Sequence, residues 1–314
     1  MKTLVATLLC LAACAAQAFP DKPVRVVVPW PAGGPSDTLA RVVNAEVTKI
    51  LGQTIIIDNR VGASGTVGTE FVARSAPDGY TLFWAIPNHT TNQLLFKVSY
   101  DPIKDFAPVG QIATSSYMVL VNPALPVKSM KEWVAHVKGQ PGKLNYASAG
   151  NGTLQHLGME LLKREAGLDI VHVPYKGSAP AIVDVLGGQV FMMFESTTAS
   201  LTHVRSGKLR PLAVASLKRI APLPDLPTIA ESGYPGFEVV GFTGVVAPAG
   251  TPPAAIAVLN AAYNKALAAA EVRERMGAMG VDPAPTTPAD FGAFLQAQVP
   301  KYTQILKASG AKVD

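Results

Sequence analysis

The sequence predicts an α/β protein with two lobes, each built on a mostly parallel sheet flanked by helices. Three observations indicate this fold class. Short β-branched runs alternate with segments of helical periodicity in both halves of the chain, as expected for repeated strand–helix–strand units. A Gly-rich turn follows a strand-like run in each half, at Pro29–Asp37 and at Ser148–Thr153. The length of 314 residues also suits two lobes better than one.

The first half alternates predicted strands and helices. Apolar residues at helical spacing predict a helix that begins with Ser36 or Asp37 as its N-cap and ends at Gly52. Gly65–Ser75 is predicted to form a second helix. The predicted strands of this half are Val24–Val28, Thr54–Ile57 and Tyr80–Ala85.

The second half repeats this order of elements. Leu154–Leu162 and Ile182–Leu186 carry apolar residues at helical spacing, and each segment is predicted to be a helix between two strands. The predicted strands of this half are Leu144–Ala147, Ile170–Val173, Val190–Phe194 and Leu212–Ala215.

Two longer strands are predicted to cross between the lobes. Val109–Val121 and Phe237–Ala247 are β-rich and bounded by prolines, so they could act as hinges or, alternatively, as ordinary edge strands. Helices are predicted at Pro253–Gly277 and Phe291–Leu306. We expect one lobe to contain residues 19–115 and about 235–275, and the other to contain about 116–234 and 276–314.

The N-terminus has the pattern of a secretory signal peptide. Lys2 precedes a short apolar stretch, and Ala16–Ala18 is an A-x-A site, which predicts cleavage after Ala18 and removal of residues 1–18. A lipobox-like sequence that ends at Cys14 leaves lipid anchoring there as an alternative. Cys10 and Cys14 are the two cysteines of the chain, so the mature chain is predicted to contain no disulfide and no cysteine nucleophile.

Charge and motifs argue against two classes of ligand. The formal net charge is +5, but Lys and Arg are scattered and do not alternate with aromatic residues, so no nucleic-acid binding is expected. No phosphate-binding P-loop is present, and the spacing of Gly62, Gly65 and Gly68 differs from the dinucleotide fingerprint. No cofactor is therefore predicted.

The two Gly-rich turns predict an anion site. A turn between a strand and a helix aims unpaired backbone N–H groups and the positive end of a helix dipole at one point. One such turn in each half predicts two lobes that close on an anionic ligand. Glycine could also serve the turns alone.

The loops at the carboxyl ends of the predicted strands are where a ligand of an α/β sheet is expected. They are rich in Gly, Ser, Thr and Asn, and Arg60 and Lys176 are their only cations. We therefore expect neutral dipoles to hold the anion, although each hydroxyl could instead be a helix cap. These loops are Trp30–Asp37, Asn59–Thr66, Pro87–Thr91, Ser148–Thr153, Tyr175–Ser178 and Glu195–Thr198.

Aromatic residues near these loops are candidates for contact with the carbon skeleton of the ligand. They are Trp30, Trp84 and Tyr175.

Catalytic and metal-binding interpretations have weaker support. Ser148 lies on a predicted strand–turn–helix, but Tyr146 replaces the first glycine of the G-x-S-x-G motif, so an exported α/β hydrolase is only an alternative. His156 and Glu160 lie one helical turn apart without a third ligand in a recognisable pattern. We predict no catalytic residue and no metal site.

Motifs along nearly the whole mature chain carry a resemblance to a known family. They include Pro29–Asp37, Asp58–Gly65, Ala76–Leu82, Tyr100–Val109, Leu144–His156, His172–Pro180, Leu226–Gly233 and Ala247–Pro252. In these motifs the chain resembles the Bug-type extracytoplasmic solute receptors of tripartite tricarboxylate transporters. The resemblance implies a periplasmic-binding-protein fold that closes on a small organic carboxylate and delivers it to membrane permease subunits. It also implies a non-enzymatic, periplasmic protein, and we expect a monomer.

The resemblance implies that backbone amides and hydroxyl groups from both lobes hold the carboxylate. The corresponding residues are Ala32, Gly33, Gly34, Ser36 and Asp37 in one lobe and Ala149, Gly150, Asn151, Thr153 and Ser178 in the other.

Two loops depart from the family pattern. The segment Trp84–Asn92 and the segment Glu195–Thr198 both differ from the usual family sequence. Because both loops are expected to border the ligand, Asn88, His89, Glu195 and Ser196 are predicted to contribute to selectivity for an aliphatic or aromatic carboxylate. A role as the carboxylate-sensing partner of a receptor kinase remains an alternative to transport, because both use ligand-driven closure.

Overall fold

The computed structural model describes residues 19–309. The predicted signal peptide, its cleavage site and the alternative lipid attachment at Cys14 lie outside the described residues. Within the described part of the chain, no helix is both long and apolar enough to cross a membrane.

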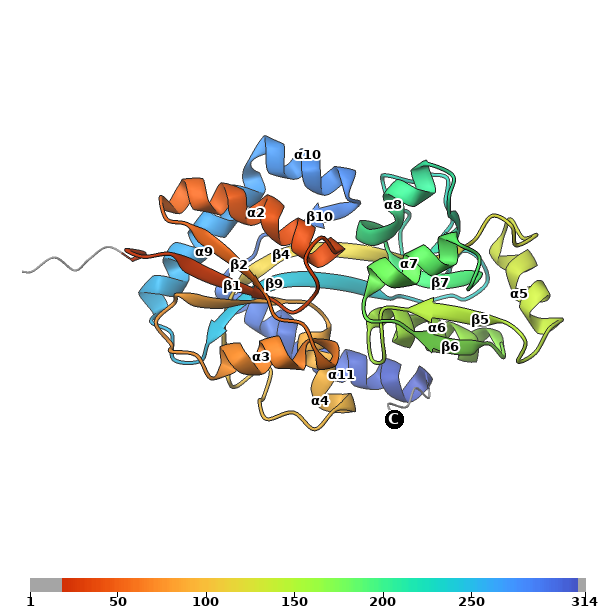
Figure 1. Cartoon of the computed structure of the whole chain (residues 1–314), viewed down its shortest axis with the longest axis horizontal. Helices are drawn as coiled ribbons and strands as arrows, with labels where there is room; N and C mark the ends of the chain where they lie inside the picture. Colours follow the sequence, from red (N-terminus) through yellow and green to blue (C-terminus); the bar gives the residue numbers. More distant parts are fainter. Residues whose placement is uncertain (1–18, 310–314) are drawn as a thin grey trace, which may run out of the picture.

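One continuous run of strands extends along the molecule, as Figure 1 shows. The strand order is β2-β1-β3-β9-β4-β7-β5-β6, with β8 and β10 also paired to β4. The strands are β1 (Val24–Val28), β2 (Ile55–Asn59), β3 (Thr81–Ala85), β4 (Phe106–Val121), β5 (Asn145–Ser148), β6 (Val171–Pro174), β7 (Met192–Ser196), β8 (Arg210–Val214), β9 (Val240–Pro248) and β10 (Val281–Pro283).

Helices cover both faces of these strands (Figure 1), which confirms the predicted α/β class. In the first half, α2, α9 and α10 pack on one face and α3 and α11 on the other. The helices are α2 (Pro35–Leu51), α3 (Thr66–Ala73), α4 (Asn88–Leu95), α5 (Met130–Lys138), α6 (Leu154–Ala166), α7 (Ser178–Leu186), α8 (Thr197–Arg205), α9 (Pro253–Ala268), α10 (Ala270–Ala278) and α11 (Pro288–Ser309).

Strand β4 joins the two halves of the sheet. Its first part pairs with β9 and β10, and its last residues, Tyr117–Val121, pair with β7 and β8. The pairs β1–β2, β1–β3, β5–β6 and β5–β7 are parallel, whereas every ladder of β4 is antiparallel. Each half is therefore a parallel α/β unit attached to a shared antiparallel strand. We call β1–β3, β9 and β10 the first half, and β5–β8 the second half.

Within residues 19–309, strand β9, unlike β4, does not pair with strands of the second half. It pairs with β3 and β4 in the first half only. The chain reaches it from the second half, where the N–H of Val239 donates to the carbonyl of Ala215 at 2.9 Å. The two segments that connect the halves thus lie side by side.

The C-terminal helix α11 holds the halves together from one face. Its buried residues Phe291 and Leu295 share a core cluster with Phe83 of the first half and Tyr146 of the second. Helix α11 contacts both α4 and α6. Because β10 pairs with Ala113–Ser115 and α11 contacts both halves, the lobe boundaries proposed for the C-terminal third stay a prediction.

Two helix predictions need correction. The single helix expected at Pro253–Gly277 is two helices, since Ala269 has an extended ψ of 132° between α9 and α10. The N-cap of α2 is Gly34, not Ser36 or Asp37, because Pro35 already occupies the first turn. Proline lacks the N–H and has the fixed φ that this position favours.

Candidate functional site

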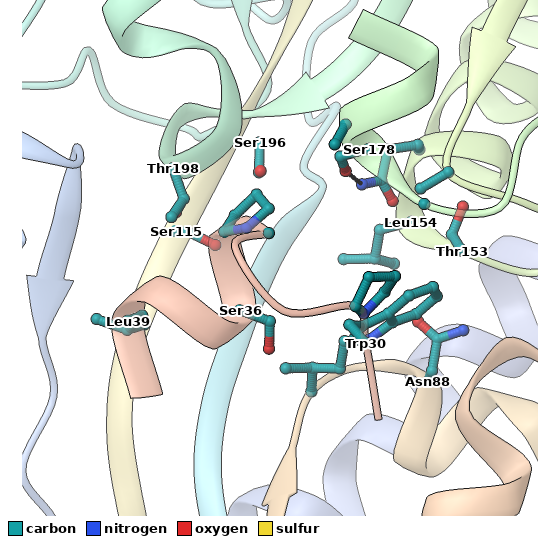
Figure 2. Close-up of a pocket in the computed structure, with 18 of the residues that line it drawn as sticks. Trp30, Ser36, Leu39, Asn88, Ser115, Thr153, Leu154, Ser178, Ser196 and Thr198 are labelled. Carbon is teal, nitrogen blue, oxygen red and sulfur yellow. Dashed lines mark hydrogen bonds between the residues drawn. The ribbon is translucent and has the colours of Figure 1, made fainter. Parts of the chain in front are cut away.

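A cavity of about 270 Å³ lies between the two halves (Figure 2). The first half contributes Trp30 and Ser36, and the second half contributes Thr153, Ser178 and Ser196. The remaining lining residues include Ser115 and Tyr117 of β4 and Phe242 and Thr243 of β9, the two strands beside which the halves meet.

The N-termini of five helices meet at this cavity. The first or N-cap residues of α2, α4, α6, α7 and α8 all line it. Each helix N-terminus carries unpaired N–H groups and the positive end of a macrodipole. Their convergence creates a positive potential without a buried cation, which favours a bound anion.

Three of these helices, α2, α4 and α7, begin without a side-chain cap, and in α2 and α7 the N-cap residue is a glycine. The N-cap residues of α2 and α7 are Gly34 and Gly177, and neither helix start has a side-chain cap hydrogen bond. The N–H groups of their first turns are therefore left for a ligand. In contrast, α6 and α8 are capped by the side chains of Thr153 and Ser196.

Asp37 holds the first Gly-rich turn in place from behind. Its Oδ2 accepts hydrogen bonds from the N–H of Gly33 and from Nε of Arg41, both at 2.8 Å, and its Oδ1 accepts one from Nδ2 of Asn59 at 2.9 Å. Burial raises the pKa of Asp37, but the hydrogen bonds from Arg41, Gly33 and Asn59 outweigh it, so this pKa lies below its usual value. The ionised carboxylate therefore fixes the turn.

A histidine pair supports the second Gly-rich turn. Nε2 of His172 lies 2.6 Å from Oγ of Ser148, and Nδ1 of His156 accepts the N–H of Gly152 at 3.1 Å. The two imidazole rings stack with centroids 4.0 Å apart. Burial lowers the pKa of both, that of His172 to about 3, so both rings are neutral near pH 7.

This arrangement gives Ser148 a structural role. Its side chain is fully buried beneath the turn and does not line the cavity. The Ser148 nucleophile of the alternative hydrolase interpretation is therefore not presented to a ligand.

Ten of the residues predicted to bind ligand line the cavity. They are Trp30, Ala32, Gly33, Gly34, Ser36, Asn88, Ala149, Thr153, Ser178 and Ser196. Five others lie outside the lining: Asp37, Gly150, Asn151, Tyr175 and Glu195.

Trp84 and His89 require correction, since both are in the core. Trp84 is fully buried, because its β3 position faces α2 and α9 rather than the strand end. The ring of His89 packs against Phe83 and Phe106, and its Nε2 lies 2.8 Å from the carbonyl of Pro102. Tyr175 also turns away, with its hydroxyl donating to Asp184 at 2.7 Å.

Sequence reasoning missed the floor and much of the apolar lining. The crossing strands were predicted as hinges. A strand that passes between two lobes also lies beneath the cleft between them, so its side chains there are expected to line the cavity. The residues that this argument could have identified are Ser115, Tyr117, Phe242 and Thr243. No pattern pointed to Gln155. Further apolar lining residues that were not predicted include Leu39, Ile86 and Leu154.

Most of the polar groups that line the cavity are uncharged. Lys176 is the one charged residue among those that line the cavity, and it is exposed. Trp30 Nε1, Ser36 Oγ and Asn88 Nδ2 are buried atoms without a hydrogen-bond partner in the described protein. Figure 2 shows these three residues on one side of the cavity. Donors of this kind are available for a ligand.

The fold and the site together define a two-lobed solute-binding protein with a cleft at which five helix N-termini meet. Residues 39–311 match the family described as tripartite tricarboxylate transporter family receptor. The chain belongs to this family, whose members are periplasmic binding proteins and not enzymes.

Relatives and solved structures agree with this assignment. Protein BugT of Bordetella pertussis is 36% identical over 312 residues, which cover 98% of this chain and 96% of BugT. An R. palustris protein solved with adipate is 36% identical with a TM-score of 0.91, and the match covers 94% of this chain and all (100%) of that one. MatC from Rhodopseudomonas palustris with bound malate is 36% identical with a TM-score of 0.86, over 92% of this chain and 100% of MatC.

Proposed function

We propose that the chain binds a small organic dicarboxylate between its two halves and delivers it to the permease of a tripartite tricarboxylate-type transporter. The observation that carries this proposal is the convergence of five helix N-termini on a cavity with one charged lining residue, Lys176. Preorganised dipoles hold a carboxylate reversibly, since its departure leaves no unpaired buried cation.

Two relatives support the ligand class. One was solved with adipate and the other with malate, and both molecules carry a carboxylate at each end. A cleft with helix N-termini in both walls suits such a ligand, because one carboxylate can meet α2 while the other meets α6 or α7.

Export to the periplasm is part of the proposal. Cleavage after Ala18 would release residues 19–314 into the periplasm, where they could meet a permease at the periplasmic face of the inner membrane. Membership in a receptor family supports this location and this partner.

A ligand screen tests the proposal. The melting temperature of purified residues 19–314 is measured with succinate, malate, adipate, citrate, benzoate, amino acids, sugars and divalent cations. A bound ligand adds about 2.7 kcal/mol of stability at one hundred times its Kd. We expect a dicarboxylate to raise the melting temperature, and a response only to amino acids, sugars or cations would refute the ligand class.

A pair of variants tests the role of the α2 N-terminus. Gly34 is the N-cap of this helix and has an extended backbone that aspartate and asparagine adopt readily. In Gly34→Asp the new carboxylate occupies the anion position, whereas Gly34→Asn has the same shape without the charge. We expect Gly34→Asp to bind the dicarboxylate at least about tenfold more weakly than Gly34→Asn. Equal affinity in isothermal titration calorimetry would contradict this role.

A further inference from the structure

A fully buried carboxyl group lies directly behind the second-half wall of the cavity. Glu195 is the fourth residue of β7 and has no exposed surface. Its Oε1 accepts three hydrogen bonds: from the N–H of Ser196 at 2.6 Å, from Oγ of Ser196 at 2.9 Å and from Nε2 of Gln155 at 2.9 Å. Burial holds the pKa of Glu195 above its usual value, although the hydrogen bonds from Ser196, Ser178 and Gln155 act in the opposite direction. Oε1 stays an acceptor in either protonation state, since the backbone N–H of Ser196 can only donate.

This contact decides which way the Ser196 hydroxyl points. A serine hydroxyl has one hydrogen, and Ser196 donates it to Glu195. The same oxygen accepts the N–H of Ala199 at 3.4 Å as the cap of α8. Ser196 also lines the cavity, so it can offer a ligand only a lone pair.

Glu195 also fixes the orientation of the Gln155 side-chain amide. One hydrogen of its amide goes to Glu195, and the other goes to Oγ of Ser178 at 3.2 Å, the contact that is dashed in Figure 2. The amide cannot reverse, because its oxygen would then face the acceptor oxygen of Glu195. Gln155 lines the cavity, and its carbonyl oxygen is the group left for a ligand.

The first-half wall of the cavity presents hydrogen-bond donors instead of acceptors. Trp30 Nε1 and Asn88 Nδ2 are donors, and both are buried without a partner among the described residues. The first-half wall therefore offers hydrogens and the second-half wall, at Ser196 and Gln155, offers lone pairs.

We propose that Glu195 is a positioning residue that fixes Ser196 and Gln155 of the second-half wall as hydrogen-bond acceptors, so that the site selects hydroxycarboxylates over the same carboxylates without the hydroxyl group. This inference rests on the proposed function, carboxylate binding in this cavity. A ligand hydroxyl would donate to Ser196 or Gln155, while a methylene group in its place leaves those buried acceptors unpaired. The expected preference is about tenfold or more in Kd.

Isothermal titration calorimetry on residues 19–314 tests this with matched ligand pairs. Each enantiomer of malate is compared with succinate, and each enantiomer of 2-hydroxyadipate with adipate. In the unmodified protein we expect at least one hydroxylated ligand to bind about tenfold more tightly than its partner. Equal affinities in both pairs would overturn the inference and leave the proposed function standing, whereas no binding by any of these ligands would overturn both.

Two substitutions at Glu195 separate positioning from a general structural role. Glu195→Met has a similar volume and only a weakly accepting thioether sulfur, so the hydrogens of Ser196 and Gln155 become free to turn toward the cavity. Its preference for the hydroxyl is expected to fall to within about twofold, with succinate still bound. Glu195→Gln keeps a carbonyl oxygen for Ser196 and is expected to retain the preference.

A merely structural role would change the affinities for both ligands of a pair alike and leave their ratio unchanged in Glu195→Met. That result would overturn the inference. The melting temperature shows whether each variant is folded. If Glu195→Met does not fold, Ser196→Ala replaces it, since that substitution removes the Ser196 acceptor itself. We expect Ser196→Ala to reduce the ratio of the two affinities, and an unchanged ratio in this variant would also overturn the inference.

Discussion

At the scale of single residues, several imidazoles of this protein are buried in their neutral form. The pKa of His89 falls to about 4 because its ring is buried against Phe83 and Phe106. His156 and His172 have lowered pKa values for the same reason. Because the pKa values of these rings differ between the folded and unfolded chain, the free energy of unfolding depends on pH.

We expect stability to fall as the pH drops from about 6.5 to 4. The unfolded chain binds a proton at His89 near its usual pKa of 6.5, whereas the folded chain does so only near 4. The unfolded state therefore holds more protons in this window, and the stabilisation present above pH 6.5 is lost as the pH approaches 4. The loss from this residue is about 3 kcal/mol.

Thermal unfolding between pH 4 and 7.5 measures this effect. His89→Gln is expected to show a shallower decline than the unmodified protein, since one titrating group is gone. His203→Gln, at a half-buried position on α8 outside the cavity lining, is the control. An identical pH dependence in His89→Gln would contradict the assignment.

At the scale of elements, sequence patterns located most strands and missed several helices. Val24–Val28 was predicted with the bounds it has, because a β-branched run in a buried strand has a strong local signal. Helices α4 and α8 were predicted as loops. Their sequences are rich in Thr, Asn and Ser, which have modest helix propensity, and packing in the core decides their conformation.

Two glycines show how close packing differs between elements. A Cβ at Gly244 of β9 would collide with the ring of Phe291, whereas a Cβ at Gly277 of α10 meets nothing within 4 Å. We expect Gly244→Ala to destabilise the protein by about 1–3 kcal/mol, because α11 must shift away from the sheet. Gly277→Ala should stabilise it by up to about 1 kcal/mol through helix propensity.

Chemical denaturation measures both glycine variants. Each substitution adds one methyl group, so the two serve as matched controls for each other. Similar free energies of unfolding for Gly244→Ala and Gly277→Ala would show that α11 does not pack on β9 as described.

At the scale of the whole molecule, the two halves touch each other directly at residues outside the cavity lining. Oγ of Ser64 donates to the carbonyl of Asn151 at 3.2 Å, and Gly152 lies against the side chain of Leu95. These contacts join segments of opposite halves, while β4 and the chain before β9 connect the halves beneath the cavity. Small backbone changes in these connections would open the cleft.

Ligand-driven closure is measurable with spin labels. Val67 on α3 and Val183 on α7 are 49% and 64% exposed, lie in different halves and do not line the cavity, and both native cysteines fall within residues 1–18. In Val67→Cys/Val183→Cys, a bound dicarboxylate should shorten and narrow the distance distribution. The pair Val171→Cys/Val183→Cys, within one half, should not respond. An unchanged Val67–Val183 distribution with saturating ligand would argue against closure.

The sequence by itself determined the class of protein, and it predicted the chemistry of the site. Strand and helix periods, Gly-rich turns at strand ends and the scarcity of cations are local properties, and they predicted an α/β protein that holds an anion through neutral groups. Only the tertiary structure decided that five helix N-termini meet at one cavity, that Trp84 lies in the core while Trp30 lines the site, and that Glu195 accepts hydrogen bonds from both Ser196 and Gln155. These features depend on strand order and packing between residues far apart in the chain, which no local pattern encodes.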